Sequence, residues 1–515
     1  MPQLTDIALR TYFKWRQKNI EKVLSDPAPF QSRLLQKILN ENSNTQYGKK
    51  YTFTHVNNYT DYKKAVPLVA YNDIENHIHA MIDGKHNVLN KDVITWFAKS
   101  SGTSNNRSKY IPVSKNYLTN GHLKCAWDAA SYIYNEDPQA KLFADKTFIM
   151  GGSIEELGNN KFAGDISAII LHHFPKIGRR FYTPDFETAL MKNWDEKIKR
   201  MAKLTADENV TLFAGVPSWT LVLFEEILKQ TGKENISEVW PNLKSYLHGG
   251  VGFEPYEKLI RQMLPSPKVN FREVYNASEG YFGIQNQKQI EGMTLLFDHE
   301  IFYEFIPFES IDETNPTCLT IDEVEKGKRY VLVITNSSGL YRYKMDDVIE
   351  FTSTKPYKIK VRSRTQQYLN AFGEELMVCN TDTAIATTCL KHQAVIKNYT
   401  VAPQFMGKQN TGRHEWLIEF AQPPQNLNAF KKDLDLELRT LNSDYDAKRS
   451  YDLVMSELNI QRVEQGTFEN WLRSKGKYGG QNKIPRLSNT RKLIEEILSI
   501  EVTIAEKKIK QSTYQ

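Results

Sequence analysis

The stretch 97-FAKSSGTSNNRSKYIPVS-114 gathers hydroxyl side chains around a single glycine, between an aromatic-rich run and a Lys-Tyr-Ile-Pro-Val run. The residues concerned are Ser100, Ser101, Gly102, Thr103, Ser104 and Ser108. Hydroxyl and backbone N–H groups on such a loop can surround a phosphate, and Lys109 would add a positive charge. The spacing of the P-loop, G-x-x-x-x-G-K-[ST], is absent. Taken alone, the stretch favours an ordinary Ser/Thr-rich turn, which is the commoner structure.

The composition is that of an ordinary globular protein. The 515 residues are 40% hydrophobic and 25% charged, which suffices to bury large cores. The length predicts about three domain-sized units, or one large and one small. A net charge of +6 permits anionic substrates but is too small for this length to indicate a nucleic-acid partner. Four widely spaced cysteines without a C-x-x-C pair favour reduced thiols over disulfides or zinc ligation.

Membrane association is not expected. Asp6 and Arg10 interrupt the N-terminus, which lacks the apolar core of a signal peptide. The chain contains no run of eighteen apolar residues. We therefore expect a soluble, cytoplasmic protein.

Short apolar runs alternate with helical patterns over the first half of the chain. Apolar spacing predicts helices over 4–42, with a break at Asp26–Pro29. Expected strands are 93–98, 147–152, 245–250 and 269–275, and expected helices are 116–134, 186–203, 218–230 and 253–264. Such alternation predicts an α/β fold with a partly parallel sheet.

The pattern of residue types changes twice further along the chain. Aromatic and β-branched runs between 293 and 362 predict an antiparallel sheet or a β-barrel-like portion. Residues 366–515 are richer in charge and mix helices with short strands, including 393–405 and 415–421. We place a boundary after Thr365, which gives a large N-terminal domain of mixed sheets and helices (1–365) and a smaller C-terminal α/β domain (366–515).

A second polar cluster follows an expected strand in 275-YNASEGYFG-283. Tyr275 could stack on a base, Ser278 could bond a phosphate, and Glu279 could hold a magnesium ion. The alternative is a strand-terminal turn with Tyr275 in the core.

A third cluster lies in 339-GLYRYKMDDVIEF-351, which we interpret as a hairpin between two strands. The acidic pair Asp346-Asp347 at its expected tip could accept hydrogen bonds from two ribose hydroxyls. The alternative is a solvated turn, where aspartate is common.

The order of the three clusters resembles the core motif set of the adenylate-forming superfamily, which contains acyl-CoA synthetases, peptide-synthetase adenylation domains and luciferases. Within it, the chain is most similar to the auxin-responsive Gretchen Hagen family of acyl-acid amido synthetases, in its bacterial form. The segments that carry this resemblance run through nearly the whole chain in order: 46-QYGKKYTF-53, 66-VPLVAYNDIENHI-78, 95-TWFAKSSGTS-104, 213-FAGVPSW-219, 248-HGGVGFEPY-256, 361-VRSRTQQYLNAFGEEL-376 and 481-QNKIPRL-487.

The resemblance implies an ATP site. The phosphates would be contacted by Ser100, Ser101, Gly102, Thr103 and Ser104, with Lys109 at the end of that loop. Tyr275 would lie against the adenine, Ser278 would approach the α-phosphate, and Glu279 would bind Mg²⁺. Asp347 matches the aspartate that binds the ribose hydroxyls, and Arg364 an arginine near the hinge between the domains.

The resemblance also implies where the other substrate groups lie. Lys483 matches a C-terminal-domain lysine that reaches substrate oxygens, so that Lys483, Ser278 and Lys109 would be catalytic. Trp219 and Val222 would line the acyl site, although plain core packing is the alternative. Gly249 and Gly250 would let backbone approach the adenylate, or would simply form a strand-end turn.

Three positions depart from the family pattern. Asn105-Asn106 stand where the phosphate loop often has a glycine, Asp346 occupies a glycine position beside the ribose aspartate, and Ser363 replaces a glycine before the hinge arginine. Asp346 tolerates a left-handed turn but adds a negative charge.

The sequence thus predicts an ATP- and Mg²⁺-dependent ligase that adenylates a small carboxylic acid and passes the acyl group to an amine, such as an amino acid. The C-terminal domain would rotate between the two steps. An acyl-CoA ligase and a catalytically impaired nucleotide-binding protein are the alternatives. We expect a monomer with no nucleic-acid or membrane partner.

Overall fold

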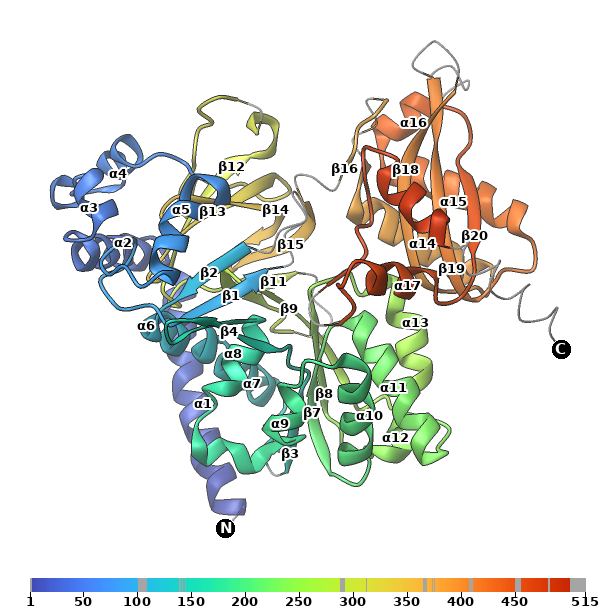
Figure 1. Cartoon of the computed structure of the whole chain (residues 1–515), viewed down its shortest axis with the longest axis horizontal. Helices are drawn as coiled ribbons and strands as arrows, with labels where there is room; N and C mark the ends of the chain where they lie inside the picture. Colours follow the sequence, from blue (N-terminus) through green and yellow to red (C-terminus); the bar gives the residue numbers. More distant parts are fainter. Residues whose placement is uncertain are drawn as a thin grey trace. The chain divides into compact units, whose positions relative to one another are not determined.

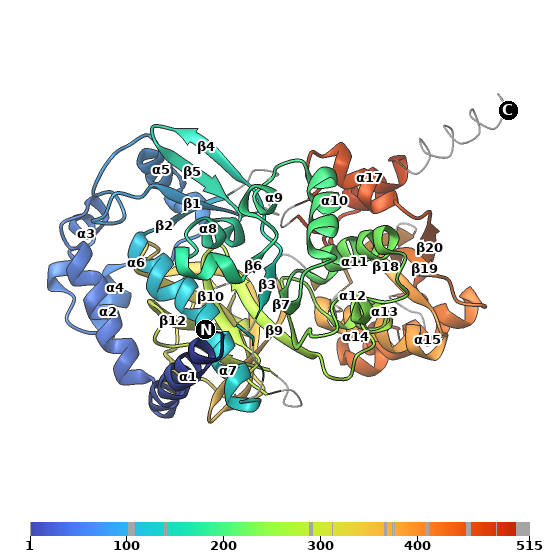
Figure 2. The ribbon, with the colours of Figure 1, turned by 90° about the horizontal axis from the view of Figure 1, so that it is seen from below.

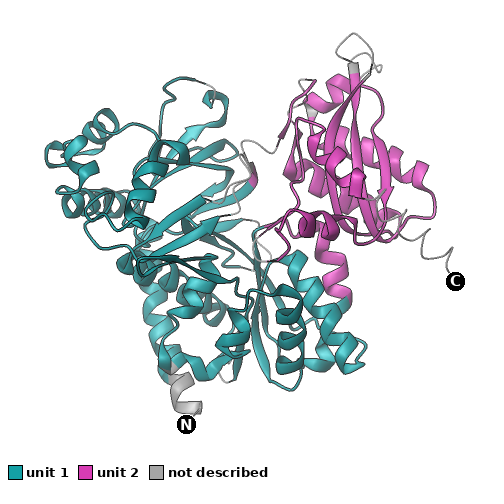
Figure 3. Ribbon diagram, in the orientation of Figure 1, with its two compact units in different colours: residues 1–250, 263–361 teal, residues 251–262, 362–515 magenta. Residues whose placement is uncertain are grey.

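The computed structural model describes residues 2–100, 109–138, 140, 142–143, 145–287, 292–311, 313–364, 368–372, 374, 376–406, 411–449, 455–479 and 482–500. The chain divides into two compact units (Figure 3). Unit 1 contains residues 1–250 and 263–361, and unit 2 contains residues 251–262 and 362–515. Residues 365–367 lie outside the described residues, so the domain boundary after Thr365 stays a prediction.

An eleven-stranded sheet forms the centre of unit 1, in the order β12-β13-β14-β15-β11-β10-β9-β8-β7-β3-β6 (Figure 1). The parallel half contains β3 (Lys146–Ile149), β6 (Tyr182–Thr183), β7 (Val210–Ala214), β8 (Ser245–Gly249) and β9 (Asn270–Ala277). The other half contains β10 (Gly280–Ile284), β11 (Met293–Leu295), β12 (Ile301–Pro307), β13 (Arg329–Asn336), β14 (Tyr343–Thr354) and β15 (Tyr357–Arg364). The sequence correctly predicted both halves, and the two join in a single sheet.

Helices cover both faces of the parallel half. Leu212 of β7 packs with Phe13 of α1 (Pro2–Ser25) and Ile133 of α7 (Lys124–Glu136). The next residue, Phe213, faces the opposite side and meets Phe224 of α11 (Pro217–Thr231). Because both faces are covered, β7 is buried along nearly its whole length, and its sequence VTLFA is apolar except for Thr211. Figure 2 shows α1 and α7 side by side.

A smaller sheet, in the order β2-β1-β5-β4, lies in the same unit. Its strands are β1 (Trp96–Ser100), β2 (Lys109–Val113), β4 (Ile154–Gly158) and β5 (Lys161–Gly164). β1 pairs antiparallel with β2, and Ser100 lies opposite Lys109. The two strands therefore flank the opening segment of hydroxyl residues.

Local capping explains where the helices begin and end. The expected break within 4–42 is confirmed, because α1 ends at Ser25 and α2 (Ala28–Asn42) begins beside Pro27. The expected helix 186–203 is two helices, α9 (Phe186–Ala189) and α10 (Trp194–Thr205). Asp185 caps the first and Asn193 the second by accepting backbone N–H bonds, which fixes two separate starts.

The remaining helices of unit 1 are α3 (Gln46–Lys50), α4 (Tyr59–Ala65), α5 (Tyr71–Ile82), α6 (Lys115–Tyr117), α8 (Ile166–His172) and α12 (Ile236–Val239). A π-helical turn over Leu118–Leu123 joins α6 to α7, so the expected helix 116–134 changes its winding along its length.

Unit 2 is built on a three-stranded sheet in the order β18-β19-β20. The strands are β18 (Val395–Met406), β19 (Thr411–Gln422) and β20 (Asn459–Val463), beside the short pair β16 (Tyr368–Leu369) and β17 (Leu376–Met377). Its helices are α13 (Glu254–Met263), α14 (Val378–Lys391), α15 (Leu427–Leu441), α16 (Ser443–Arg449) and α17 (Thr467–Ser474). Tyr399, Trp416 and Phe430 are central members of its buried core.

Candidate functional site

The parallel strands of unit 1 end at one edge of the large sheet. Chain turns follow these ends at Gly151-Gly152 after β3, Gly215 after β7, Gly250 after β8 and Ser278-Glu279 after β9. Because β3, β7, β8 and β9 are neighbours and parallel, these turns share the carboxyl edge. In α/β sheets ligands bind at this edge.

Two of the glycines allow close packing there. A Cβ on Gly249 would lie 2.2 Å from the carbonyl oxygen of Val274 in β9, and Gly250 has a φ of +85°. Both residues end β8 as the turn that the sequence allowed as one interpretation. Their contact with a substrate stays a prediction.

Lys197 of α10 holds a third glycine turn at the same edge, and the sequence analysis missed it. Its buried Nζ donates to the carbonyl oxygens of Gly151, at 2.5 Å, and Gly152, at 2.7 Å. Burial lowers the pKa of Lys197 to about 7, and the nearby Asp165 opposes that shift. Lys197 is one of three lysines in α10, so the sequence gave no signal for this role.

Trp219 lies in the first turn of α11, close in sequence to the end of β7. Its ring is buried and meets Trp194 edge-on, with centroids 4.7 Å apart. Val222 is half-buried. Leu221, Leu223, Phe224 and Ile227 of this helix are core. The acyl-site roles of Trp219 and Val222 stay predictions.

Ser278 and Glu279 form the two-residue turn between β9 and β10. The Ser278 hydroxyl donates to the carbonyl oxygen of Lys99 in β1 over 3.4 Å, so the ends of β9 and β1 meet. The main-chain oxygen of Glu279 accepts from Tyr117 Oη at 2.8 Å and Asn336 Nδ2 at 3.1 Å. These two donors fix the turn through its backbone.

Tyr275 and Asp347 are in direct contact. The Tyr275 hydroxyl donates to Asp347 Oδ2 over 2.5 Å, and both residues are buried. The Tyr275 ring also packs on Phe282, with centroids 4.7 Å apart. Tyr275 therefore belongs to the core, as one interpretation held, and its hydroxyl also orients the proposed ribose carboxylate.

The expectation that Asp346-Asp347 form the tip of a hairpin is wrong. Both residues lie inside β14, where Met345, Asp346 and Asp347 stand opposite Leu332 alone, so β14 bulges. The turn itself holds buried Leu340 and Tyr341, and the Tyr341 hydroxyl donates to the carbonyl oxygen of Leu89. Because buried apolar residues occupy the turn, the acidic pair lies in the bulge instead. A bulge changes the direction in which side chains point.

Arg342 of the same motif is structural. Its Nε donates to both Glu304 oxygens at 3.0 and 3.1 Å, and its Nη1 donates to the carbonyl oxygens of Lys63 and Val66. With a φ of +45°, it closes the turn in a left-handed conformation.

Lys109 and Asp346 form an ion pair with Nζ 3.3 Å from Oδ2. The Lys109 ammonium also lies 5.8 Å from the centroid of the Tyr71 ring, and the Tyr71 hydroxyl accepts from the Tyr110 backbone N–H. These contacts connect the start of β2 to β14 and to α5.

These contacts close a ring that we call the strand-end ring. Its members, all in unit 1, are Ser100, Lys109, Tyr275, Ser278, Asp346 and Asp347. Starting from Ser278, the ring passes to β1, across to Lys109, to the bulge of β14 and back to β9 through Tyr275. It joins the ends of β1, β2 and β9 to the bulge inside β14, and these places are far apart in the sequence.

Several residues of the sequence prediction lie elsewhere. Ser101, Gly102, Thr103, Ser104 and Asn105-Asn106 fall outside the described residues. Arg364 ends β15, but its side chain is likewise outside the description, and Ser363 beside it is buried. Lys483 is half-buried in unit 2. The predicted roles of these residues stay predictions.

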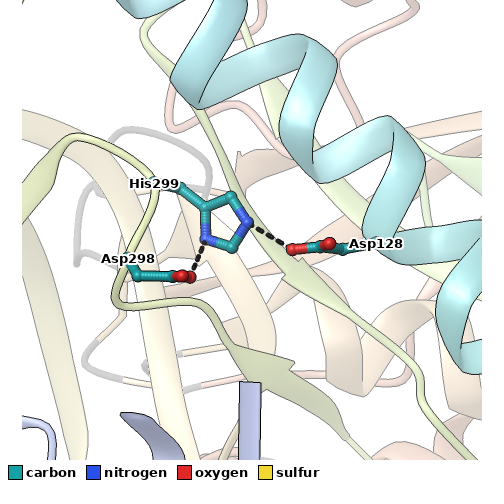
Figure 4. A group of neighbouring side chains, drawn as sticks. All are labelled: Asp128, Asp298 and His299. Carbon is teal, nitrogen blue, oxygen red and sulfur yellow. Dashed lines mark hydrogen bonds and ion pairs between the residues drawn. The ribbon is translucent and has the colours of Figure 1, made fainter. Parts of the chain in front are cut away.

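A second charged cluster contains Asp128 of α7 together with Asp298 and His299 (Figure 4), and the sequence gave no sign of it. His299 Nε2 lies 2.7 Å from Asp128, and its Nδ1 lies 3.1 Å from Asp298. Arg16 bonds both carboxylates, and Lys124 bonds Asp298 at 2.9 Å. We call these five residues the Arg16 network.

The Arg16 network contains the spacing of a metal site, with three candidate ligands within 4.8 Å of one another. However, Arg16 and Lys124 already offset both carboxylate charges. Burial would raise the pKa of Asp128, but hydrogen bonds from Arg16 and His299 outweigh it and keep that pKa below its ordinary value. The network is a structural anchor for α1.

Comparison with known proteins gives one consistent family. Residues 16–150 and 152–269 match the GH3 family N-terminal domain, residues 294–364 the GH3 family central domain, and residues 380–492 the GH3 family C-terminal domain. These matches cover most of the chain.

Individual relatives agree with the domain matches. The chain is 24% identical to the indole-3-acetic acid-amido synthetase GH3.4 of Arabidopsis thaliana, over 91% of this chain and 90% of that protein. It is 24% identical to the jasmonoyl-L-amino acid synthetase JAR4 of Nicotiana attenuata, over 65% and 68%. The fold superposes on the AtGH3.15 acyl acid amido synthetase, solved with 2,4-DB, with a TM-score of 0.80 at 16% identity, over 95% of this chain and 96% of that one.

In the part of the chain that the structure describes, no helix is both long enough and apolar enough to cross a membrane.

Proposed function

The chain belongs to the GH3 family, and from that premise we propose that it is an ATP-dependent acyl-acid amido synthetase. It adenylates a carboxylic acid with release of pyrophosphate and then transfers the acyl group to an amine. The strand-end ring supports this proposal most strongly. It brings a cation, two hydroxyls, two carboxylates and an aromatic ring to neighbouring strand ends in unit 1.

The chemistry explains why these residue types are needed. In the first step a carboxylate oxygen forms a bond to the α-phosphorus of ATP, and the bond from that phosphorus to the pyrophosphate oxygen breaks. Two anions must approach each other, so positive charge has to offset the phosphoryl oxygens. In the second step the amine nitrogen bonds the acyl carbon, AMP leaves with the electron pair, and the amine loses its proton to solvent.

The residues of the ring fit ATP. We assign Lys109 to the phosphate charge, Ser100 and Ser278 to phosphate oxygens, and Asp347 to the ribose hydroxyls. Tyr275 holds Asp347 through its hydroxyl and offers its ring to the adenine. The carboxylate of Glu279, on the turn that Tyr117 and Asn336 fix, would hold Mg²⁺, a cation that prefers oxygen ligands. When bound, that ion would neutralise phosphate charge.

Membership of the family does not identify which acid and which amine the protein uses. The relatives named above take an indole acid and jasmonate, so membership alone does not select one carboxylic acid. We assign the acid to the region of Trp219, Val222, Gly249 and Gly250, at the carboxyl edge. A monomeric state and a cytoplasmic location accompany this proposal.

Pyrophosphate exchange tests the proposal. Purified protein is incubated with ATP, Mg²⁺, labelled pyrophosphate and a panel of aryl, indole and alkyl carboxylic acids, and label entering ATP is counted. We expect acid-dependent exchange with at least one class. The active acid is then combined with twenty amino acids or with CoA, and products are separated by mass spectrometry.

The outcomes divide the alternatives. Amide formation with an amino acid supports the proposal. A thioester with CoA and no amide would make the protein an acyl-CoA ligase. Nucleotide binding without exchange for any acid would make it a nucleotide-binding protein that lacks the reaction.

A further inference from the structure

We propose that Asp346 sets the affinity for the nucleotide by competing with its phosphates for the ammonium of Lys109. This inference rests on the proposed function, because it takes Lys109 as a phosphate-binding residue. It concerns a residue to which the proposed reaction gives no role.

The geometry places Asp346 where such competition can occur. Its Oδ2 lies 3.3 Å from Lys109 Nζ, and the side chains of Lys109 and Asp346 are 18% and 32% exposed. The pair is therefore reachable by solvent and by a dissolved anion. A Lys–carboxylate pair with this exposure is weak, so a polyphosphate can displace the carboxylate.

The bulge of β14 gives two successive carboxylates different partners. Asp347 accepts from the Tyr275 hydroxyl. Asp346 meets the Lys109 ammonium, and this contact cancels a positive charge. Lys109 lies opposite Ser100, at the strand end where the proposed phosphate contacts begin. One bulge thus presents the proposed ribose ligand and weakens the proposed phosphate ligand.

The expected consequence of the Lys109–Asp346 contact is a moderate affinity for the nucleotide. ATP carries several negative charges, and each gains more from a lysine that no carboxylate neutralises. The same weakening speeds the departure of AMP after the acyl group has been transferred. Tyr71 keeps the Lys109 side chain near this position in both states, since the ammonium lies 5.8 Å from its ring.

Asp346→Asn tests the inference, because asparagine keeps the shape of the side chain and removes its charge. Binding of the Mg²⁺ complex of the non-hydrolysable analogue AMPCPP is measured by calorimetry, and the KM for ATP by pyrophosphate exchange. We expect Kd and KM to fall about three- to tenfold. The fall should shrink as salt is added, because salt screens exposed charges.

A double-mutant cycle distinguishes the direct Lys109–Asp346 ion pair from a general effect of the Asp346 charge on the bound nucleotide. Lys109→Met should weaken binding, and in that background Asp346→Asn should change Kd by less than about twofold. The matched control is Glu41→Gln, which breaks the Lys91–Glu41 ion pair of 3.2 Å in the same unit and should leave Kd unchanged. Thermal melting verifies that each variant is folded.

Unchanged or weaker AMPCPP binding by Asp346→Asn would overturn the inference, as would an equal effect in the Lys109→Met background. The outcome for the proposed function is separate, because it depends on pyrophosphate exchange by the wild type. If the wild type exchanges pyrophosphate but Asp346→Asn changes nothing, only the inference fails. If Asp346→Asn tightens AMPCPP but no acid supports exchange, the inference holds and the amido synthetase assignment fails.

Discussion

The Arg16 network and the strand-end ring both combine carboxylates with cations in unit 1, yet they differ in access to solvent. Asp128 and His299 of the network are each 1% exposed, whereas Lys109 and Asp346 of the ring are 18% and 32% exposed. The network connects α1, α7 and the turn before β12, and each of its five residues bonds at least one of the others. The ring connects the ends of β1, β2 and β9, which belong to two sheets, with the bulge of β14.

This difference separates charge that stabilises the fold from charge that is offered to a ligand. A buried ion pair stabilises the native state only when its members satisfy one another, and losing one member is costly. A half-exposed pair contributes little to stability, and its charges remain available to a dissolved ion. Variants in the Arg16 network should therefore lower stability and leave activity unchanged. Variants in the strand-end ring should change activity and leave stability nearly unchanged.

The largest expected effect is on stability, in the Arg16 network. Asp128→Asn removes the charge of the more buried of the two carboxylates that Arg16 and His299 share. We expect the free energy of unfolding to fall by ~3–5 kcal/mol, with pyrophosphate exchange per folded molecule unchanged. Urea unfolding followed by tryptophan fluorescence measures the first quantity. Equal urea midpoints for variant and wild type would show that the network is not an anchor.

The pH provides an internal control for that variant. The pKa values of Asp128 and Asp298 are both held below their ordinary value in the folded protein, because Arg16 and His299 outweigh burial. Their stabilisation is therefore present above the unfolded-state pKa of about 4 and is lost as the pH falls through the lower folded-state values. The difference in stability between wild type and Asp128→Asn should be constant near pH 7 and should narrow below about pH 4.

The next effect is on activity, beside the ring. Glu279→Gln removes the carboxylate assigned to Mg²⁺ but keeps the backbone oxygen that Tyr117 and Asn336 bond. We expect exchange to fall about 100-fold, with a higher Mg²⁺ requirement and an unchanged melting temperature. A Mg²⁺ titration of the exchange rate is the measurement. Wild-type exchange at all Mg²⁺ concentrations would remove Glu279 from the reaction.

The smallest effect concerns the hydroxyl that joins two members of the ring. Tyr275→Phe keeps the ring that packs on Phe282 but deletes the donor to Asp347. Since a hydrogen bond to a charged group contributes about 1.5–3 kcal/mol, the KM for ATP should rise about tenfold or somewhat more. Tyr71→Phe, which deletes the hydroxyl that accepts from the Tyr110 N–H, is the matched control and should change KM much less. A rise only for Tyr71→Phe would contradict the role given to Tyr275.

The sequence predicted the layers of the fold because their signals are local. Apolar runs between helical patterns marked β3, β8 and β9, and Pro27 marked the end of α1. The order of three polar clusters led to the family, which the domain matches confirm. These signals all lie within short stretches of the chain.

The contacts that complete the site have no such local signal. Lys109 and Asp346 are 237 residues apart, and Tyr117 and Glu279 are 162 apart. The placing of Asp346-Asp347 at the tip of the hairpin was wrong because turn propensity cannot register a bulge, which depends on the register of β14 against β13. His299 and its two carboxylates likewise meet only through the tertiary fold.

The backbone attachment of the Ser278-Glu279 turn has a consequence for engineering. Two donors from distant parts of the chain, Tyr117 and Asn336, hold the Glu279 carbonyl oxygen. The turn is therefore positioned through its backbone, so a substitution of the side chain proposed to bind the metal should leave these two bonds in place. A library at position 279, with aspartate, histidine or cysteine among its members, would be a direct route to variants that accept other divalent ions.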